Sequence, residues 1–501
     1  MSNRGVRTNR RGFLCGLSAS LGSAAFAGAP ETSPFPAPRP TGWHLQTLPS
    51  LEDLISAAEL PGKTSLALAD ARTGEIIETS NPLLSHPPAS VTKVITALYA
   101  QDALGPGFRF HTRLITHGEL LNGRLDGDII LVGGGDPTLD TDDLAELAIQ
   151  LKNAGVREIT GKLRVSSNIL PNLAMIDPGQ PDHVGYNPSV SGLNLNFNRV
   201  YFEWKRAEED RYNLVMDART RRHRPRVSVS QMEVADRDLP VYTYANSGEQ
   251  DRWTVARTAL GNEGGRWLPV RHPGAYAAEV FQTLARSHGI QLELGVPMRS
   301  ALANGSVLAE HNSEPLREIL RRMLRFSTNL TAEAIGLSAT RMRQLNNNSL
   351  QRSGTAMADW MRGTYGTRQP EFVDHSGLGD GSRLSARDMV KVLINNEAQS
   401  RMRDLLKPIA LRNAQGDVID NRRMEVVAKT GTLNFVSTLA GYMRTPNGRH
   451  LAFAIFMSDL PHRARLTRAE RERPEGGRAW SRRARRLQND LLSRWGVAFE
   501  A

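Results

Sequence analysis

Pro87-Pro88-Ala89-Ser90-Val91-Thr92-Lys93-Val94 places a serine and a lysine three residues apart at the predicted start of a helix. Two prolines suit the approach to a helix, and apolar residues recur at helical spacing after them. Side chains at i and i+3 share a helix face, so we expect the Lys93 amine to reach the Ser90 hydroxyl. A lysine with a lowered pKa can take the serine proton, and the positive helix N-terminus favours the alkoxide. The stretch predicts a nucleophilic serine; the alternative is a surface serine beside a solvated lysine.

Two later segments supply matching chemistry. Lys429-Thr430-Gly431 follows Val426-Val427-Ala428 on a predicted buried strand, where the lysine offers a fixed charge to a carboxylate and the glycine lets a ligand backbone approach. Ser327-Thr328-Asn329 follows an apolar helical pattern, and its hydroxyl and amide can pass a proton and hold a substrate amide. A second Ser-x-Asn element, Ser166-Ser167-Asn168, has a strand-like context and is interpreted as structural.

The three motifs in this order resemble the signature of penicillin-binding proteins and serine β-lactamases. The sequence around these motifs is similar to one family in particular, the penicillin-binding protein 4 (DacB-type) D-alanyl-D-alanine carboxypeptidase/endopeptidases. The similarity runs from Gly62 to the predicted C-terminal helix. The matching segments are Pro88 to Lys93, Gly134 to Leu139, His311 to Leu316, Asn329 to Glu333, Lys429 to Leu433 and Leu439 to Tyr442.

The resemblance implies an α/β (α+β) fold, with a serine β-lactamase/transpeptidase-like catalytic domain, an antiparallel sheet flanked by helices, and two nested inserted domains. The long stretch between Ser90 and Ser327 agrees with such insertions, because a compact β-lactamase needs far less chain. We expect the catalytic domain over 46–105 and 271–501, an inserted α/β domain over 106–165 and 245–270, and a nested β-rich inserted domain over 166–244.

By the same resemblance, Ser90 attacks the carbonyl of a terminal D-alanyl-D-alanine bond and Lys93 takes its proton. Water then hydrolyses the acyl-enzyme. Ser327 relays a proton toward the leaving amine, and Asn329 holds the substrate amide. The sequence leaves open which lysine is neutral, and whether carboxypeptidase action on stem-peptide ends or endopeptidase action on cross-links dominates.

The substrate-binding strand is implied in the same way. Lys429, a candidate catalytic residue, and Thr430 bind the terminal carboxylate of the peptide or of a β-lactam. Gly431 and Thr432 complete the strand along which the substrate lies. Backbone N–H groups of Ser90 and Thr432 are the expected oxyanion donors.

Three positions depart from the family pattern. Thr328 stands where aspartate is usual, with its side chain expected to point away from the cleft. After Asp374 the chain reads His375-Ser376-Gly377-Leu378-Gly379-Asp380 in place of Asp-Gly-Ser-Gly-Leu-Ser-Arg. Arg383 is the candidate replacement for the missing arginine, and the alternative is that the substrate contacts differ. The acidic residue and phenylalanine that help the family recognise diaminopimelate correspond to Ser166 and Leu170. Diaminopimelate recognition is therefore not supported by these residues.

The N-terminus predicts export. Asn9-Arg10-Arg11-Gly12-Phe13-Leu14 and a small-residue apolar run ending at Ala27 resemble a twin-arginine signal peptide over 1–27, with an ordinary secretory signal or a short anchor as alternatives. A proline-rich linker is expected over 28–45. Cys15 is the only cysteine, so a mature chain has neither a disulfide nor a thiol nucleophile. The predicted location is the periplasm.

The composition and charge of the chain limit the classes of molecule that it is expected to bind. The net charge of +11 and pI of 10.0 suit anionic cell-wall polymers or a membrane surface, and no helix-turn-helix, zinc-finger or RNA-binding motif points to nucleic acid. Expected partners are peptidoglycan peptides as substrates and β-lactam antibiotics as inhibitors, with peripheral membrane or wall association open for the arginine-rich C-terminal helix. The histidines are scattered without a His-x-x-x-His pair beside a glutamate, so neither a metal nor another cofactor is expected.

Two other classes compete with the peptidase. A serine β-lactamase needs fast deacylation, yet no Glu-x-x-Leu-Asn element of the class A type lies between Ser90 and Ser327. A non-catalytic penicillin-sensing or cell-wall-binding protein would lose part of the motif set, whereas every motif residue is present. Both observations favour the peptidase.

Overall fold

The computed structural model describes residues 48–248, 250–298, 304–397, 402–412, 417–418 and 424–499. The predicted signal peptide, the proline-rich linker and Cys15 lie outside the described residues. Within them, no helix combines the length and apolarity needed to cross a bilayer.

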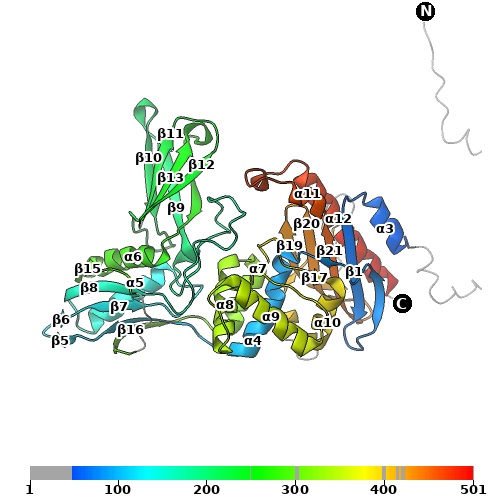
Figure 1. Cartoon of the computed structure of the whole chain (residues 1–501), viewed down its shortest axis with the longest axis horizontal. Helices are drawn as coiled ribbons and strands as arrows, with labels where there is room; N and C mark the ends of the chain where they lie inside the picture. The colour runs from blue at the N-terminus through cyan, green and yellow to red at the C-terminus, as the bar shows by residue number, and fades with distance from the viewer. Residues whose placement is uncertain are drawn as a thin grey trace, which may run out of the picture. The chain divides into compact units, whose positions relative to one another are not determined.

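A six-stranded antiparallel sheet forms the layer that carries the site (Figure 1). The predicted strand that carries Lys429 is confirmed as the first of three consecutive paired strands near the C-terminus. A hairpin within residues 63–80 pairs with the last of the three, so the two ends of the described chain share one sheet. In spatial order the strands are β18 (Lys407–Pro408), β19 (Glu425–Leu433), β20 (Val436–Arg444), β21 (His450–Ser458), β1 (Lys63–Asp70) and β2 (Ile76–Ser80).

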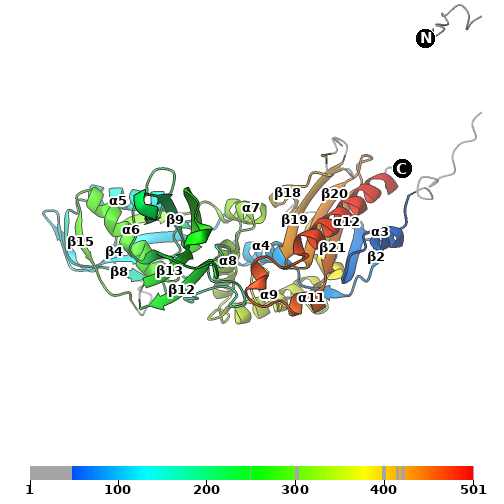
Figure 2. The same ribbon diagram turned by 90° about the horizontal axis from the view of Figure 1, so that it is seen from above.

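Helices cover both faces of this sheet, because residues of each strand alternate between the faces. Ala67 and Ala69 of β1 pack with one group of helices, whereas Leu66 and Leu68 pack against α12 on the other face (Figure 2). The first group comprises α4 (Thr92–Leu104), α7 (Leu316–Phe326), α8 (Asn329–Met342), α9 (Leu350–Tyr365) and α10 (Ala386–Glu397), and the second face carries α3 (Leu51–Ala57) and α12 (Gly477–Ala498).

The amphipathic C-terminal helix is confirmed as α12. Its apolar face is buried against the sheet, and its arginine-rich face is exposed. The buried residues of that face are Trp480, Ala484, Leu487, Leu491 and Trp495.

A second, seven-stranded sheet follows α4 in the chain. It runs β16-β4-β7-β8-β6-β5 with β15 also paired to β8, and α5 (Thr141–Asn153) and α6 (Pro273–Ser287) belong to the same hydrophobic core. Its strands are β4 (His111–Thr116), β5 (Glu119–Leu121), β6 (Arg124–Asp126), β7 (Ile129–Val132), β8 (Glu158–Ser166), β15 (Gln291–Leu294) and β16 (Ser306–Asn312).

Two three-stranded sheets lie between β8 and α6 in the chain. Phe202 of β9 and Trp253 of β13 connect them to the core of the seven-stranded sheet. The first sheet has β10 (Tyr212–Asp217), β9 (Arg199–Arg206) and β14 (Glu263–Pro269), and the second has β11 (Ser230–Ala235), β13 (Gln250–Ala256) and β12 (Tyr242–Ser247). The short elements β3 (Ser85–His86), β17 (Leu384–Ser385) and α11 (Leu460–Ala464) complete the fold.

The packing bears on where the inserted part ends. Helix α6 and strands β15 and β16 share the core or the sheet of the inserted elements, although they follow residue 271. Ser313, immediately after β16, bonds back to Phe110 just before β4. We therefore propose that the inserted part spans Phe110 to Ser313, and that the catalytic layer resumes at α7.

Candidate active site

Ser90 and Lys93 meet at the start of α4. Ala89–Val91 forms a 3-10 turn, and the α-helix begins at Thr92, two residues later than the sequence predicts for a helix from Ser90. Residues at i and i+3 eclipse one another in a 3-10 turn. The Lys93 Nζ accordingly lies 3.1 Å from the Ser90 Oγ, so the expected contact is present with tighter local geometry.

Lys93 is fully buried, and two carbonyl oxygens accept from its amine. Asn329 Oδ1 and the Ser376 main-chain oxygen each lie 2.8 Å from Nζ. Burial lowers the pKa of Lys93 to about 8, although the charges of Glu333 and Asp374 act in the opposite direction. A neutral amine has two N–H donors and one lone pair. The two carbonyls engage both donors, so the lone pair is left for the Ser90 hydroxyl.

Ser327 is the hydroxyl that joins the two halves of the site. It ends α7 in a left-handed conformation with φ of 60°, which turns its side chain toward α4. Ser327 Oγ lies 2.9 Å from Ser90 Oγ and 3.0 Å from Lys429 Nζ. The two serines therefore form a continuous hydrogen-bonded chain between the two lysines.

Lys429 lies on β19 and is buried. Its Nζ also donates to the Thr430 carbonyl at 2.8 Å. Burial and, after it, the positive charges of Lys93 and Lys407 together lower the pKa of Lys429 to about 6. A bound carboxylate would have the opposite effect on this lysine, because an opposite charge favours the ammonium form.

Asn329, the first residue of α8, has both ends of its amide engaged. Oδ1 accepts from Lys93, and Nδ2 donates to the Tyr186 carbonyl at 2.8 Å. The lysine and the carbonyl together fix the orientation of the amide, because only one end can donate. Tyr186 belongs to the inserted part of the chain, which therefore contacts the site directly.

Gly431 allows β19 to pass close to the 3-10 turn. A β-carbon at this position would lie 2.9 Å from both Ser90 N and the Pro88 carbonyl, which is too close for any side chain. Thr438 on β20 donates to the same Pro88 carbonyl at 2.8 Å. The glycine thus serves the approach of the protein's own backbone, besides the ligand contact that the sequence suggests.

Two buried carboxylates hold the segment that carries Ser376. Glu333 accepts the backbone N–H groups of His375 and Ser376 at 2.9 Å each. Asp374 accepts those of Gly377 and Gly379 at 2.6 Å each. Burial raises the pKa of both carboxyls above the ordinary value, although their N–H donors and the charge of Lys93 act in the opposite direction.

Sequence reasoning did not single out Glu333, Asp374 or Ser376 as site residues. Glu333 lies one helical turn after Asn329, within a segment of sequence that matches the family. This spacing places both residues on one face of the helix and was the available signal that Glu333 lies near the site. The Ser376 contribution is a main-chain oxygen, for which no side-chain pattern exists.

The structure gives Arg383 no place in the site. Its guanidinium donates to the main-chain oxygens of Asp380 and Ser382, and it is absent from the lining of the cleft. Asp380, at the position of the missing arginine, instead pairs with Arg463 and Arg471, which do line the cleft. The predicted replacement is therefore wrong, and guanidinium groups reach this region from a later segment.

The competing Ser-x-Asn element stays structural, as expected. Ser166 is buried at the end of β8, and the Asn168 amide donates to the Met298 carbonyl. Leu170 is buried in a small apolar cluster with Leu330 and Leu337. None of these inserted-part residues lines the cleft.

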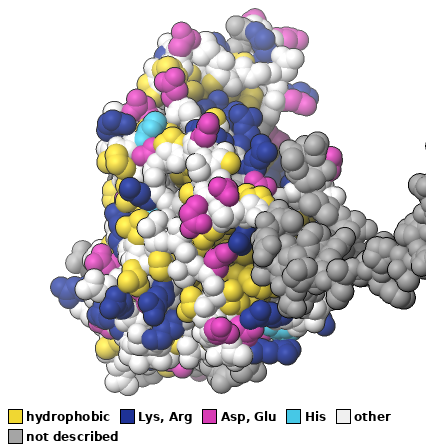
Figure 3. Space-filling model, turned by 90° about the vertical axis from the view of Figure 1, so that its right-hand side faces the viewer, with side chains coloured by type: hydrophobic (Ala, Val, Ile, Leu, Met, Phe, Trp, Pro, Cys, Tyr) yellow, Lys and Arg dark blue, Asp and Glu magenta, His cyan; other side chains and the backbone are white. Residues whose placement is uncertain are grey.

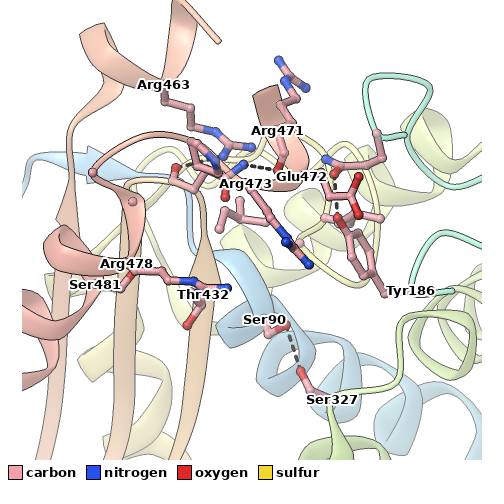
Figure 4. Close-up of a pocket in the computed structure, with 18 of the residues that line it drawn as sticks. Ser90, Tyr186, Ser327, Thr432, Arg463, Arg471, Glu472, Arg473, Arg478 and Ser481 are labelled. Carbon is pink, nitrogen blue, oxygen red and sulfur yellow. Dashed lines mark hydrogen bonds between the residues drawn. The ribbon is translucent and has the colours of Figure 1, made fainter. Parts of the chain in front are cut away.

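A cleft of about 1200 Å³ opens beside Ser90. Ser90, Ser327, Asn329 and Thr432 form one side of its lining. Figure 4 shows the bond between the two serines, with arginines on the wall above them. No group of His, Cys, Asp and Glu suited to a metal occurs in the described part of the chain.

Burial, a lowered lysine pKa and a pair of hydroxyls beside an open cleft are the features that a serine–lysine acyl-transfer site requires. The model of the D-Ala-D-Ala carboxypeptidase 3 (S13) family matches residues 48–474. The chain belongs to this family, and the resemblance to DacB-type enzymes is confirmed.

Individual relatives agree. The chain is 28% identical over 391 residues to the D-alanyl-D-alanine carboxypeptidase DacB of Haemophilus influenzae, covering 74% of this chain and 80% of the relative. The crystal structure of penicillin-binding protein 4 (dacB) from that organism matches with a TM-score of 0.70 at 23% identity, over 89% of this chain and all of the other. The same protein complexed with a β-lactam matches with a TM-score of 0.67 at 22% identity, with equal coverage. The predicted fold class is confirmed.

Proposed function

We propose that the protein is a serine-type D-alanyl-D-alanine carboxypeptidase, and also an endopeptidase on peptidoglycan cross-links, with Ser90 as its nucleophile. The observation that carries this assignment is the unbroken chain from Lys93 through Ser90 and Ser327 to Lys429. Each link lies within hydrogen-bond distance, so a proton can travel along it.

Acylation begins when neutral Lys93 takes the Ser90 proton. Ser90 Oγ bonds to the carbonyl carbon of the penultimate D-alanine, and the C–N bond to the terminal residue breaks. The leaving amine receives a proton from Ser327, which regains one from the protonated Lys429 at 3.0 Å. Exchange with solvent then restores the proton of Lys429 and removes the one that Lys93 took, so that one proton has passed in net from Ser90 to the amine and Lys93 is again neutral. Water then attacks the ester, passes its proton to Lys93, and Ser90 leaves protonated.

Binding groups surround this chemistry. Lys429 and Thr430 take the terminal carboxylate, which would pair with the protonated Lys429. Backbone N–H groups of Ser90 and Thr432 stabilise the oxyanion. The closeness of β19 to the 3-10 turn supports this pairing, because a Gly431 β-carbon would lie 2.9 Å from Ser90 N.

The proposed reaction agrees with the expected β-lactam inhibitors, and its substrate agrees with the expected periplasmic location. A β-lactam presents an acyl carbon and a carboxylate, so it would acylate Ser90 in place of the peptide. Peptidoglycan lies outside the cytoplasm, which suits the predicted export through a twin-arginine signal and residence in the periplasm. The cleft is open, which supports action on cross-links as well as on peptide ends.

Intact-mass analysis with and without benzylpenicillin tests the nucleophile. We expect one adduct, located on the Ser90 peptide and absent from Ser90→Ala. Ser338→Ala is the matched control, because Ser338 bonds only within α8. Labelled muropeptides then test turnover, and nitrocefin tests for β-lactamase action. An adduct on another residue, or muropeptides left intact by an acylatable protein, would contradict the proposal.

A further inference from the structure

Arginines line the cleft opposite the nucleophile. They come from α11, from the α11–α12 connection and from the first turns of α12. Figure 3 shows that Lys and Arg side chains are frequent on the face it views, with a group of them in its upper part. Arg463 and Arg471 share one acidic partner, Asp380. The other four are exposed, and no described residue provides an acidic partner for them: Arg473, Arg478, Arg482 and Arg485.

The acidic group on this wall is already engaged. Glu472 lines the cleft, and its carboxylate lies 3.1 Å from His183. Gly477, where α12 begins, also lines the cleft, so the positive end of a 22-residue helix adds to the charge. In Figure 4 the Arg478 side chain is directed toward Thr432. The wall therefore presents a net positive field next to Ser90.

The direction of β19 tells which part of a substrate meets this wall. The proposed function, on which this step rests, puts the terminal carboxylate at Lys429 and Thr430 and the scissile carbonyl at Ser90. Thr432, Leu433 and Asn434 continue the strand beyond that point, and all three line the arginine-walled cleft, whereas Lys429 and Thr430 do not. The arginines thus face the acyl part, which stays bonded to Ser90 after the leaving group departs.

We infer that this arginine wall is a specificity site for carboxylates carried by the acyl part of the substrate. A guanidinium group binds a carboxylate by donating two parallel N–H groups to its two oxygens. An amidated carboxylate has only one acceptor oxygen and no charge, so it cannot accept this pair of bonds. Stem-peptide residues before the scissile bond carry such carboxylates, on the γ-linked D-glutamate and on the side chain of a diamino acid. The protein therefore prefers stem peptides whose carboxylates are free over those in which they are amidated.

Two peptides test this preference. One is L-Ala-γ-D-Glu-(meso-diaminopimelyl)-D-Ala-D-Ala, and the other has both carboxylates before the scissile bond amidated. The readout is the kcat/KM for the peptide with free carboxylates divided by the kcat/KM for the amidated peptide. We expect Arg473→Gln/Arg478→Gln to lower this ratio by roughly two- to tenfold, as for a pair of exposed charge contacts. Added salt should lower the wild-type ratio as well, because exposed charges are screened.

Controls separate the possible failures. Arg486→Gln removes an exposed α12 arginine that pairs with Asp490 and does not line the cleft, so its ratio should equal that of the wild type. Acylation by benzylpenicillin shows that each variant is folded. If the wild type hydrolyses both peptides and the double variant keeps its ratio, the inference is wrong. If the wild type hydrolyses neither peptide, the proposed function itself fails.

Discussion

Ser90 Oγ and Ser327 Oγ lie 2.9 Å apart, and each also contacts a different lysine. The two lysines differ in their setting, because Lys93 is near the buried carboxyls of Glu333 and Asp374, whereas the charges that act on Lys429 are those of Lys93 and Lys407. Before a carboxylate binds, this difference makes Lys429 the weaker base. A substrate carboxylate at Lys429 would reverse its charge state and leave Lys93 as the group that accepts the Ser90 proton.

The pH dependence of acylation should follow Lys93. Its pKa is lowered to about 8, so below that pH most of the amine is protonated and cannot act as a base. We expect the acylation rate with benzylpenicillin to rise about tenfold per pH unit at low pH and to level off above the Lys93 pKa. Stopped-flow or quenched mass measurements give these rates. A rate independent of pH across this range would rule out Lys93 as the base.

Ligand binding should take up a proton at Lys429. Its pKa is lowered to about 6 in the empty site, so it is neutral at neutral pH, and a carboxylate should raise that pKa. We expect Ser90→Ala protein to bind an acyl-D-Ala-D-Ala peptide with uptake of up to one proton, more weakly as pH rises through the raised pKa. Calorimetry in buffers of different ionisation enthalpy measures the uptake. The same peptide with a C-terminal amide is the control, and equal uptake with both would contradict this role.

Glu333→Gln should damage both stability and catalysis. Both oxygens of Glu333 accept backbone N–H groups, and an amide can accept at only one end. One buried N–H is left unpaired, which costs about 1–3 kcal/mol of unfolding free energy. The Ser376 carbonyl would shift away from Lys93, so acylation should slow. Denaturant unfolding and acylation rates measure the two effects.

Glu314→Gln is the control for that variant, because Glu314 is exposed and its side chain makes no bond to the segment around Ser376. It should unfold and react like the wild type. A Glu333→Gln protein of unchanged stability would mean that the two N–H groups find other acceptors.

Gly377→Ala should disrupt the start of α4. Gly377 has φ of 74°, and a β-carbon there would lie 1.8 Å from the Ala89 carbonyl oxygen. Either the 3-10 turn or the 374–379 segment must move, so we expect acylation at Ser90 to be largely lost and stability to fall. Gly363→Ala in α9 is the matched change, since its β-carbon enters open space and should stabilise by about 0.5–1 kcal/mol. Acylation of Gly377→Ala at the wild-type rate would refute this account.

Local patterns predicted much of the fold and the contact between Ser90 and Lys93. The i,i+3 spacing of Ser90 and Lys93, the apolar face of α12 and the strands β19 to β21 each depend on residues that are neighbours in the chain. The order of the three motifs, through the family resemblance, then predicted that Ser327 and Lys429 join them. Their hydrogen bonds in the structure agree with that prediction.

Contacts between distant segments were beyond those patterns. Asp380 attracts Arg463 and Arg471 from a segment some eighty residues later, and Arg383, although nearer in sequence, is held by local carbonyls. Glu333 reaches the 374–379 segment across the helical layer. The strand β16 joins the inserted sheet despite its distance from β4 in the chain. Such pairings depend on three-dimensional packing, which no local periodicity encodes.

The sheet that carries Lys429 also sets when the site can form during synthesis. Strand β1, near the start of the described chain, pairs along its whole length with β21, near the end. Loop-closure entropy delays pairings between segments so far apart. A nascent chain can therefore form the Ser90 turn early but cannot bring Lys429 beside it until strands β19 to β21 have also left the ribosome. Partially synthesised chains would carry the serine without its partners and remain chemically inert.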